Sequence, residues 1–154
     1  MPSIQAAETT VTELREQLRS ADDWQRRREA ALALGRRRGD DAFVALTDAL
    51  SDRDADVRHA VVLALGELGD PRAVDYLCRP RLLEDPATEI RWATVSALGK
   101  VGDLTAANAI SRALEDPEWV VRNQALLVMA DFIRRVPETV DAEAATLHVD
   151  AEVA

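Results

Sequence analysis

The stretch "DADVRHAVVLALGELGDPRAV", residues 54–74, contains the signals for one helix, its end and the start of another. Its first part places apolar residues three or four positions apart, which is the spacing of one face of an α-helix. These residues are Val57, Val61, Ala64, Leu65 and Leu68. Gly69 suits the left-handed conformation that ends many helices, and Asp70 followed by Pro71 is typical of a helix start. The stretch therefore predicts two consecutive helices joined by a tight turn.

Three other segments of the chain have the same pattern. They read "RRREAALALGRRRGD" from Arg26, "IRWATVSALGKVGD" from Ile90 and "VRNQALLVMADFIR" from Val121. An arginine occurs at the same place in each copy, and the intervals between these arginines are 31, 33 and 31 residues. The four are Arg27, Arg58, Arg91 and Arg122. Repeats of this length indicate stacked helix pairs, because one pair alone cannot cover its own apolar face. We therefore predict an all-α fold, a right-handed α-solenoid of about four helix pairs.

The repeats set the predicted boundaries. The solenoid covers residues 10–135, in repeats of about 10–38, 39–69, 70–102 and 103–135. Its first helices are expected near residues 11–19, 41–50, 71–83 and 104–114, and its second helices near 24–37, 54–68, 87–101 and 118–134. Residues 1–9 are an N-terminal extension. Residues 136–154 contain five acids and no Lys or Arg, and we expect this tail to be flexible.

Two departures from the pattern carry predictions of their own. Pro80 lacks a backbone donor, so the first helix of the third repeat should bend or end near residue 79. In the last copy Ala130 and Ile133 replace the two glycines of the pattern. We therefore expect the last helix to run on past the usual turn and to act as a C-terminal cap.

The pattern D-x-x-x-x-V/I-R, followed by A-L-G-x-L/V-G-D, resembles the short HEAT-like repeat of phycobilin lyase subunits over about residues 20–135. The resemblance implies that the second helix of each pair lines the concave side of the solenoid. It also implies that Asp and Arg of the motif bridge neighbouring repeats. The residues concerned are Asp52, Asp85 and Asp116 with Arg58, Arg91 and Arg122, while Ala21 has the aspartate position in the first copy. A lyase-like or chaperone-like subunit that assists bilin attachment is a function that the resemblance suggests.

The sequence offers little for catalysis or metal binding. The two histidines are His59 and His148, and there is no HExxH, no Cys-x-x-Cys and no His-Glu step. Iron-containing HEAT-repeat hydroxylases resemble this architecture but rely on repeated His-Glu motifs. Cys78 follows Val74 and Leu77 on an apolar helix face, so we interpret it as a structural thiol. We expect no metal, no cofactor and no enzymatic activity.

Composition and charge bear on location and partners. The formal net charge is −9, no apolar run approaches the roughly 18 residues of a membrane span, and one cysteine cannot form an internal disulfide. No secretory signal is evident near the N-terminus, so we expect a cytoplasmic protein. Residues 11–39 contain eight arginines against five acids, which leaves nucleic-acid binding through the first repeat as an alternative. The acidic remainder of the chain argues against it.

The repeat register predicts where a partner would bind. When the four second helices are aligned by their repeat, each set of equivalent residues forms a row across the solenoid. All three tryptophans occupy rows in which the residue type varies between repeats. Tryptophan and arginine are enriched among residues that anchor interfaces, and solenoids generally bind through their concave face. We therefore predict a non-catalytic adaptor that binds another protein there. The predicted partner-binding residues are Trp24, Arg28, Leu32, His59, Leu63, Trp92, Ser96, Trp119, Asn123 and Leu127.

Overall fold

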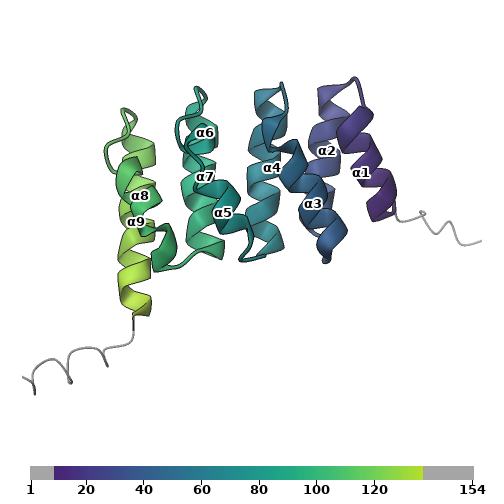
Figure 1. Ribbon diagram of the computed structural model, residues 1–154. Coiled ribbons are helices and arrows are strands. Elements are labelled where there is room, and N and C mark those ends of the chain that lie inside the picture. The colour runs from purple at the N-terminus through teal and green to yellow at the C-terminus, as the bar shows by residue number, and fades with distance from the viewer. Residues whose placement is uncertain (1–8, 137–154) are drawn as a thin grey trace, which may run out of the picture.

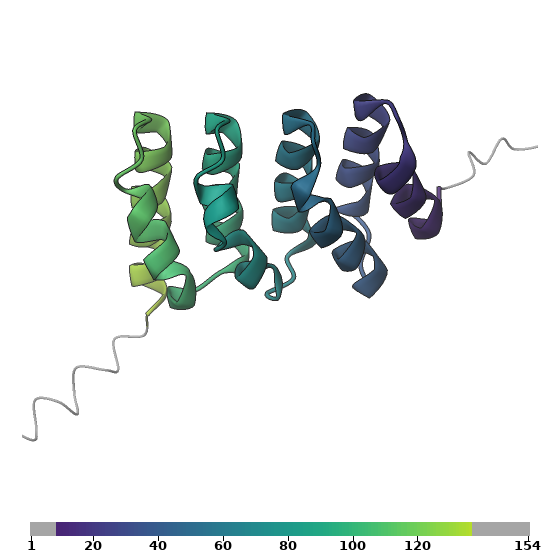
Figure 2. The same cartoon turned by 45° about the horizontal axis from the view of Figure 1, so that its top comes forward.

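The computed structural model describes residues 9–136, and this part of the chain is helical with no strand. Four helix pairs stack side by side in chain order, which confirms the predicted α-solenoid (Figures 1 and 2). The prediction of a flexible tail concerns residues that, apart from Val136, lie outside the described range.

The helix bounds agree with the predicted pairs to within a few residues. The first helices are α1 (Val11–Ser20), α3 (Asp40–Asp48) with the 3-10 turn η1 (Ala49–Ser51), α5 (Ala73–Leu77) with α6 (Pro80–Leu83), and α8 (Ala107–Ala113) after the 3-10 turn η2 (Leu104–Ala106). The second helices are α2 (Trp24–Leu34), α4 (Ala55–Leu68), α7 (Thr88–Val101) and α9 (Trp119–Arg135).

Local sequence signals explain several of these ends. Gly69 ends α4 in the left-handed conformation, with φ of +70°, which an L side chain rarely adopts. Pro80 begins α6 and separates it from α5, as predicted. The helix after the Gly69 turn begins at Ala73 instead of Pro71, although the Asp70 carboxylate still accepts a bond from the Arg72 amide. The last helix, α9, does run on to Arg135.

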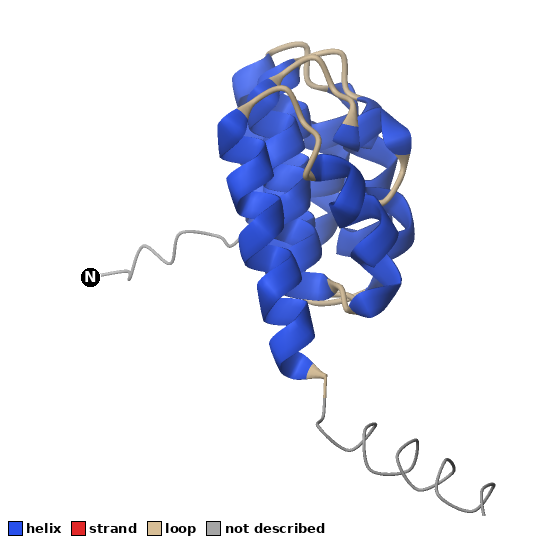
Figure 3. Cartoon of the chain, turned by 90° about the vertical axis from the view of Figure 1, so that its left-hand side faces the viewer, coloured by secondary structure: helices blue, strands red, loops and turns tan. Residues whose placement is uncertain are grey.

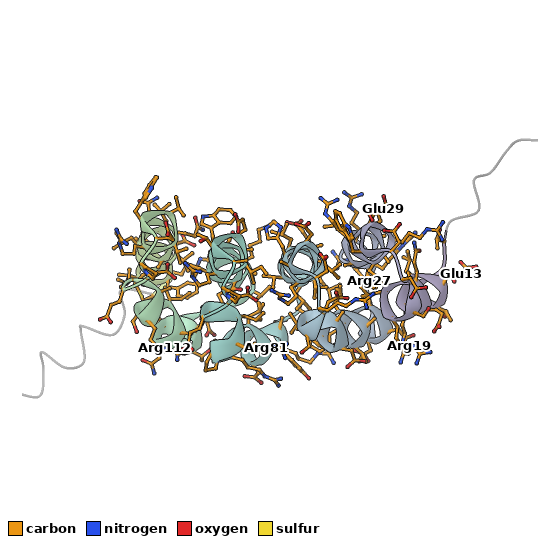
Figure 4. All side chains as sticks on the ribbon, turned by 90° about the horizontal axis from the view of Figure 1, so that it is seen from above. Glu13, Arg19, Arg27, Glu29, Arg81 and Arg112 are labelled. Carbon is orange, nitrogen blue, oxygen red and sulfur yellow. The ribbon has the colours of Figure 1, made fainter. Side chains whose placement is uncertain are left out.

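The helices form two layers, seen along the stack in Figure 3. One layer contains α2, α4, α7 and α9, and the other contains the first helices of the pairs (Figure 4). We call the α2–α4–α7–α9 layer the inner row, because it bows so that its free side lies on the inside of the curve (Figure 4). The apolar core lies between the layers, where Leu34, Leu65 and Leu98 occupy equivalent positions and are fully buried.

Neighbouring repeats are joined by a series of buried ion pairs, which we call the arginine ladder. The guanidinium of Arg27 donates to both carboxylate oxygens of Asp52, at 2.8 and 3.0 Å. Arg58 contacts Asp85 in the same way at 3.0 and 3.2 Å, and Arg91 contacts Asp116 at 2.8 and 3.0 Å. Two parallel bonds of this kind are the strongest arrangement for arginine and a carboxylate. Each arginine therefore fastens its repeat to the next one.

The ladder also closes a loop within each repeat. Nη1 of each of the four arginines donates to the carbonyl of the residue six positions before it, at 2.7–3.0 Å. The four therefore occupy equivalent positions, as predicted. The bridging set differs from the expected one. Arg27 takes part, because its carboxylate comes from the following repeat, whereas Arg122 follows the last aspartate and has no such partner within residues 9–136.

The ladder makes stability depend on pH. Burial alone raises the pKa of Asp52 and Asp116, but hydrogen bonds from Arg27 and Arg91 and from backbone amides outweigh it, so that both pKa values are lowered. In the window below the ordinary aspartate pKa of about 3.9, the unfolded chain therefore binds more protons than the folded one.

We expect these pairs to make their full contribution to the free energy of unfolding above about pH 5. This contribution should be lost progressively as pH falls towards about 2. Urea unfolding followed by circular dichroism at a series of pH values measures this. Asp116→Asn should reduce the steepness of the loss, because one of the titrating carboxylates is gone. A stability that stays constant between pH 5 and 3 would contradict the assignment.

Candidate protein-binding face

The three tryptophans are solvent-exposed on helices of the inner row. Trp24 begins α2 and is 36% exposed, Trp92 lies in α7 and is 38% exposed, and Trp119 begins α9 and is 66% exposed. None of the three is buried between helices. Large aromatic rings left partly in water are typical of binding surfaces.

The centre of the candidate face lies where α4, α7 and α9 meet. His59 and Trp92 occupy the same row of the repeat register, and together with Thr88, Glu89 and Val120 they line an open hollow of about 340 Å³. Two helical turns further along, Lys100 of α7 forms an ion pair with the equivalent residue of α4, Glu67. Residues of one register row therefore do lie side by side, as the repeat alignment predicts.

The other predicted residues line the same rows with different exposure. Arg28 and Asn123 are exposed, Leu127 is 57% exposed, and three residues are half-buried. Those three are Leu32, Leu63 and Ser96. At interhelix distances of about 8–10 Å, the two ends of the row lie roughly 25–30 Å apart. The structure thus brings His59 of α4 and Trp92 of α7 together, with Val120 of α9 beside them, and leaves Trp24 at the far end.

Trp119 also belongs to a second group of exposed residues, which the repeat register alone does not reveal. Trp119, Leu126 and Ile133 are seven residues apart, so they form one stripe along α9. Leu126 and Ile133 are 58% and 63% exposed and were not among the predicted site residues. The sequence contained a signal for Leu126, because the equivalent residues of the two preceding repeats, Val62 and Val95, are also apolar. In the structure both valines are fully buried, whereas Leu126 is exposed.

The structure weakens the case for a phosphate-binding first repeat. Arg27 is 4% exposed and is held by Asp52, so it cannot reach an external phosphate. Arg19 forms an ion pair with Glu16 on α1, and Arg37 donates to the carbonyl of Thr9. The basic residues of this repeat are thus partly engaged within the fold.

A metal or nucleophile site finds no support in the described part of the chain. No three His, Cys, Asp or Glu side chains are grouped there in a way that could hold a metal ion. Cys78 follows α5 and is half-buried, and burial together with the nearby Asp75 raises the pKa of its thiol. The thiol is therefore held in its protonated, less nucleophilic form. Among the helices of residues 9–136, none has the length and hydrophobicity to cross a membrane.

The fold and the exposed inner row define an α-solenoid of stacked helix-pair repeats. Sequence comparison agrees, because the model of HEAT repeats matches residues 11–79 and again residues 78–147. The chain belongs to the HEAT-repeat family. No protein with a curated description matches its sequence.

Two solved structures show the same architecture. Human deoxyhypusine hydroxylase, in complex with glycerol, is similar with a TM-score of 0.72 and 28% identity, over 83% of this chain and 45% of the hydroxylase chain. The complex of CpcE and CpcF of phycocyanin lyase from Nostoc sp. PCC7120 is similar with a TM-score of 0.68 and 26% identity, over 80% of this chain and 53% of the other. The chain therefore spans about half the length of each, and the resemblance to phycobilin lyase repeats is confirmed.

Proposed function

We propose that this protein is a non-catalytic adaptor that binds another protein on the free side of its inner row. The observation that carries the proposal is the exposure of Trp92 beside the hollow that it shares with His59. The residues that hold the repeats together, such as Arg91 and Leu98, lie on other sides of the same helix and are buried. The exposed ring is therefore not required by the stacking of repeats.

Physical chemistry supports a protein partner. Covering an apolar ring removes it from water, at about 25 cal/mol per Å² of apolar surface, and tryptophan is among the residues that contribute most at interfaces. Around Trp92 lie the polar groups of Thr88, Glu89 and His59, which can orient a partner by hydrogen bonds. An apolar anchor with a polar rim is the usual composition of a protein interface.

Trp92→Ala is expected to weaken partner binding by about 1–4 kcal/mol, or roughly 5- to 1,000-fold in Kd. The partner is first isolated by affinity purification from the native organism with the full chain as bait, and is identified by mass spectrometry. Its affinity for wild-type and variant protein is then measured with purified components. Trp119→Ala should also weaken binding, but Trp92 is the cleaner test because Trp119 borders the end of the solenoid as well.

Val44→Ala is the matched control. Val44 is 42% exposed on α3, in the other layer of the solenoid, so its truncation should leave binding unchanged. Melting temperatures of both variants show whether the fold is intact. Equal binding by wild type and Trp92→Ala, with both proteins folded, would contradict the proposed face.

The similarity to the phycocyanin lyase complex favours one second candidate, a subunit that assists bilin attachment. Here the open hollow beside Trp92 would hold part of the pigment. A bilin that binds changes its absorption spectrum, so titration of the full chain with a free bilin separates the two functions. A spectral change that Trp92→Ala removes would favour the lyase-like role, and no change together with a stable protein partner would favour the adaptor.

A further inference from the structure

The C-terminal end of the solenoid exposes a leucine at a position that every earlier repeat buries. Trp119, Leu126 and Ile133 form a stripe along α9, and each is between 58% and 66% exposed. We call it the end stripe. The position of Leu126 is taken in the three earlier repeats by Ala31, Val62 and Val95, and all three are fully buried. Leu126 is exposed because no helix follows α9 within the described residues.

Arg122 shows the same incompleteness in its hydrogen bonds. In each earlier repeat the ladder arginine receives a carboxylate from the next repeat through Nε and Nη2. In the described part of the chain Arg122 donates through Nη1, to the carbonyls of Asp116 and Pro117, both at 2.7 Å. Within residues 9–136 no carboxylate is bonded to it. The end of α9 thus presents an aliphatic surface beside a guanidinium that is already oriented for one more aspartate.

The opposite end of the solenoid is built differently. Exposed Arg26 in α2 occupies the position that later repeats fill with buried Val57 and Ile90. Exposed Glu29 likewise occupies the position of buried Ala60 and Ala93. Ala21 replaces the aspartate of the ladder. A second copy stacked head to tail would therefore set charged groups against the end stripe and bring no aspartate to Arg122 at the ladder position. The first repeat suits an end facing water, whereas α9 does not.

We propose that the end stripe and Arg122 bind a helix-pair repeat of another protein, which continues the stack. The partner repeat carries an aspartate in the loop before its second helix, and this carboxylate takes Nε and Nη2 of Arg122. Small and aliphatic side chains of the same repeat cover Leu126 and Ile133. Each of the three internal junctions combines such an ion pair with a buried side chain at the position of Leu126. This surface is separate from the Trp92 hollow, and the inference does not depend on the proposed adaptor function.

The probe is the repeat type that the chain itself provides. A second copy of residues 102–136, which contains its own Asp116, is inserted after Val136, and the native residues 137–154 follow it. We expect the added repeat to fold on α9, so that helical content rises and unfolding remains one transition with a larger urea m-value, because more surface is buried. A protease site placed before the inserted copy then tests binding between separate chains. After cleavage the two pieces should still elute together in size-exclusion chromatography.

Two leucine variants decide whether the end stripe is responsible. Leu126→Ser should leave the melting temperature of the native chain within about 1 °C of wild type, because no residue of the range 9–136 covers Leu126. In the chain with the added repeat, the same change should lower the melting temperature by several degrees and release the cleaved repeat. Leu127→Ser is the matched control, since Leu127 is equally exposed and lies on the inner face. It should have no effect in either protein.

Four results would overturn the inference. An added repeat that brings no helix, or that separates from the solenoid after cleavage, shows that the end stripe does not accept a repeat. A loss of stability on Leu126→Ser in the native chain shows that residues 137–154 or a second copy already cover it. Sedimentation equilibrium of the native chain tests for the second copy. A dimer would contradict the proposal, which requires a monomer. An effect of Leu127→Ser as large as that of Leu126→Ser removes the specificity of the surface.

Discussion

Replacing Arg91 with methionine is expected to lower the free energy of unfolding by about 3–5 kcal/mol, the range for breaking a buried ion pair from one side. Arg91 is 8% exposed and its two bonds to Asp116 are 2.8 and 3.0 Å long. Methionine fills much of the same volume, so the cost comes from leaving the Asp116 carboxylate buried without its partner. Urea unfolding of the purified variant at pH 7 measures the change.

Arg122→Met is the matched control for this prediction. Arg122 has the same place in its repeat and the same backbone contacts, but within residues 9–136 no carboxylate is bonded to it, so its replacement should cost only about 1–2 kcal/mol. The double variant Arg91→Met with Asp116→Leu should recover a large part of the loss, because no charge is then left unpaired. Equal losses for Arg91→Met and Arg122→Met would show that the carboxylate pair contributes nothing.

Leu65→Ala is expected to destabilise the protein by about 2–5 kcal/mol through the cavity that it creates. Leu65 lies in α4, in the same register position as Leu34 and Leu98, and is fully buried between the two layers. The repeats on both sides hold the surrounding helices in place, so the cavity cannot close by a simple shift of one element. Thermal and urea unfolding report the loss.

Leu127→Ala provides the comparison for Leu65→Ala. Leu127 is 57% exposed on α9, so its truncation should change the free energy of unfolding by less than about 0.5 kcal/mol. A loss this small for Leu65→Ala would mean that Leu65 does not lie on the buried face of α4. Similar losses at the two positions would lead to the same conclusion.

These predictions separate the residues that build the stack from those available to a partner. Along α7, Arg91, Val95 and Leu98 face neighbouring helices and are buried, whereas Trp92 is partly exposed on the inner face and Ser96 is half-buried. Substitution at the first group changes stability, and substitution at Trp92 should change binding with little effect on the fold. A repeat protein can therefore vary its binding surface while its junctions stay the same.

Part of the candidate site could be predicted because it follows from helical periodicity. Residues four apart lie on one helix face, and equivalent residues of stacked repeats lie side by side, so the pairing of His59 with Trp92 was within reach. The position of Trp119 was only half predicted. Its row assigned it to the inner face, but the row does not show that Trp119 also forms a stripe with Leu126 and Ile133 along α9.

The sequence by itself determined the helix pairs, their order and most of their ends, because these depend on local spacing, on caps such as that of Thr10 with Glu13, and on Gly69 and Pro80. Only the tertiary structure decided which charges meet. Arg27 pairs with Asp52, 25 residues later, because the carboxylate that the guanidinium needs comes from the next repeat. For the same reason Arg122, which no helix pair follows within residues 9–136, has no carboxylate bonded to its Nε and Nη2 in that range.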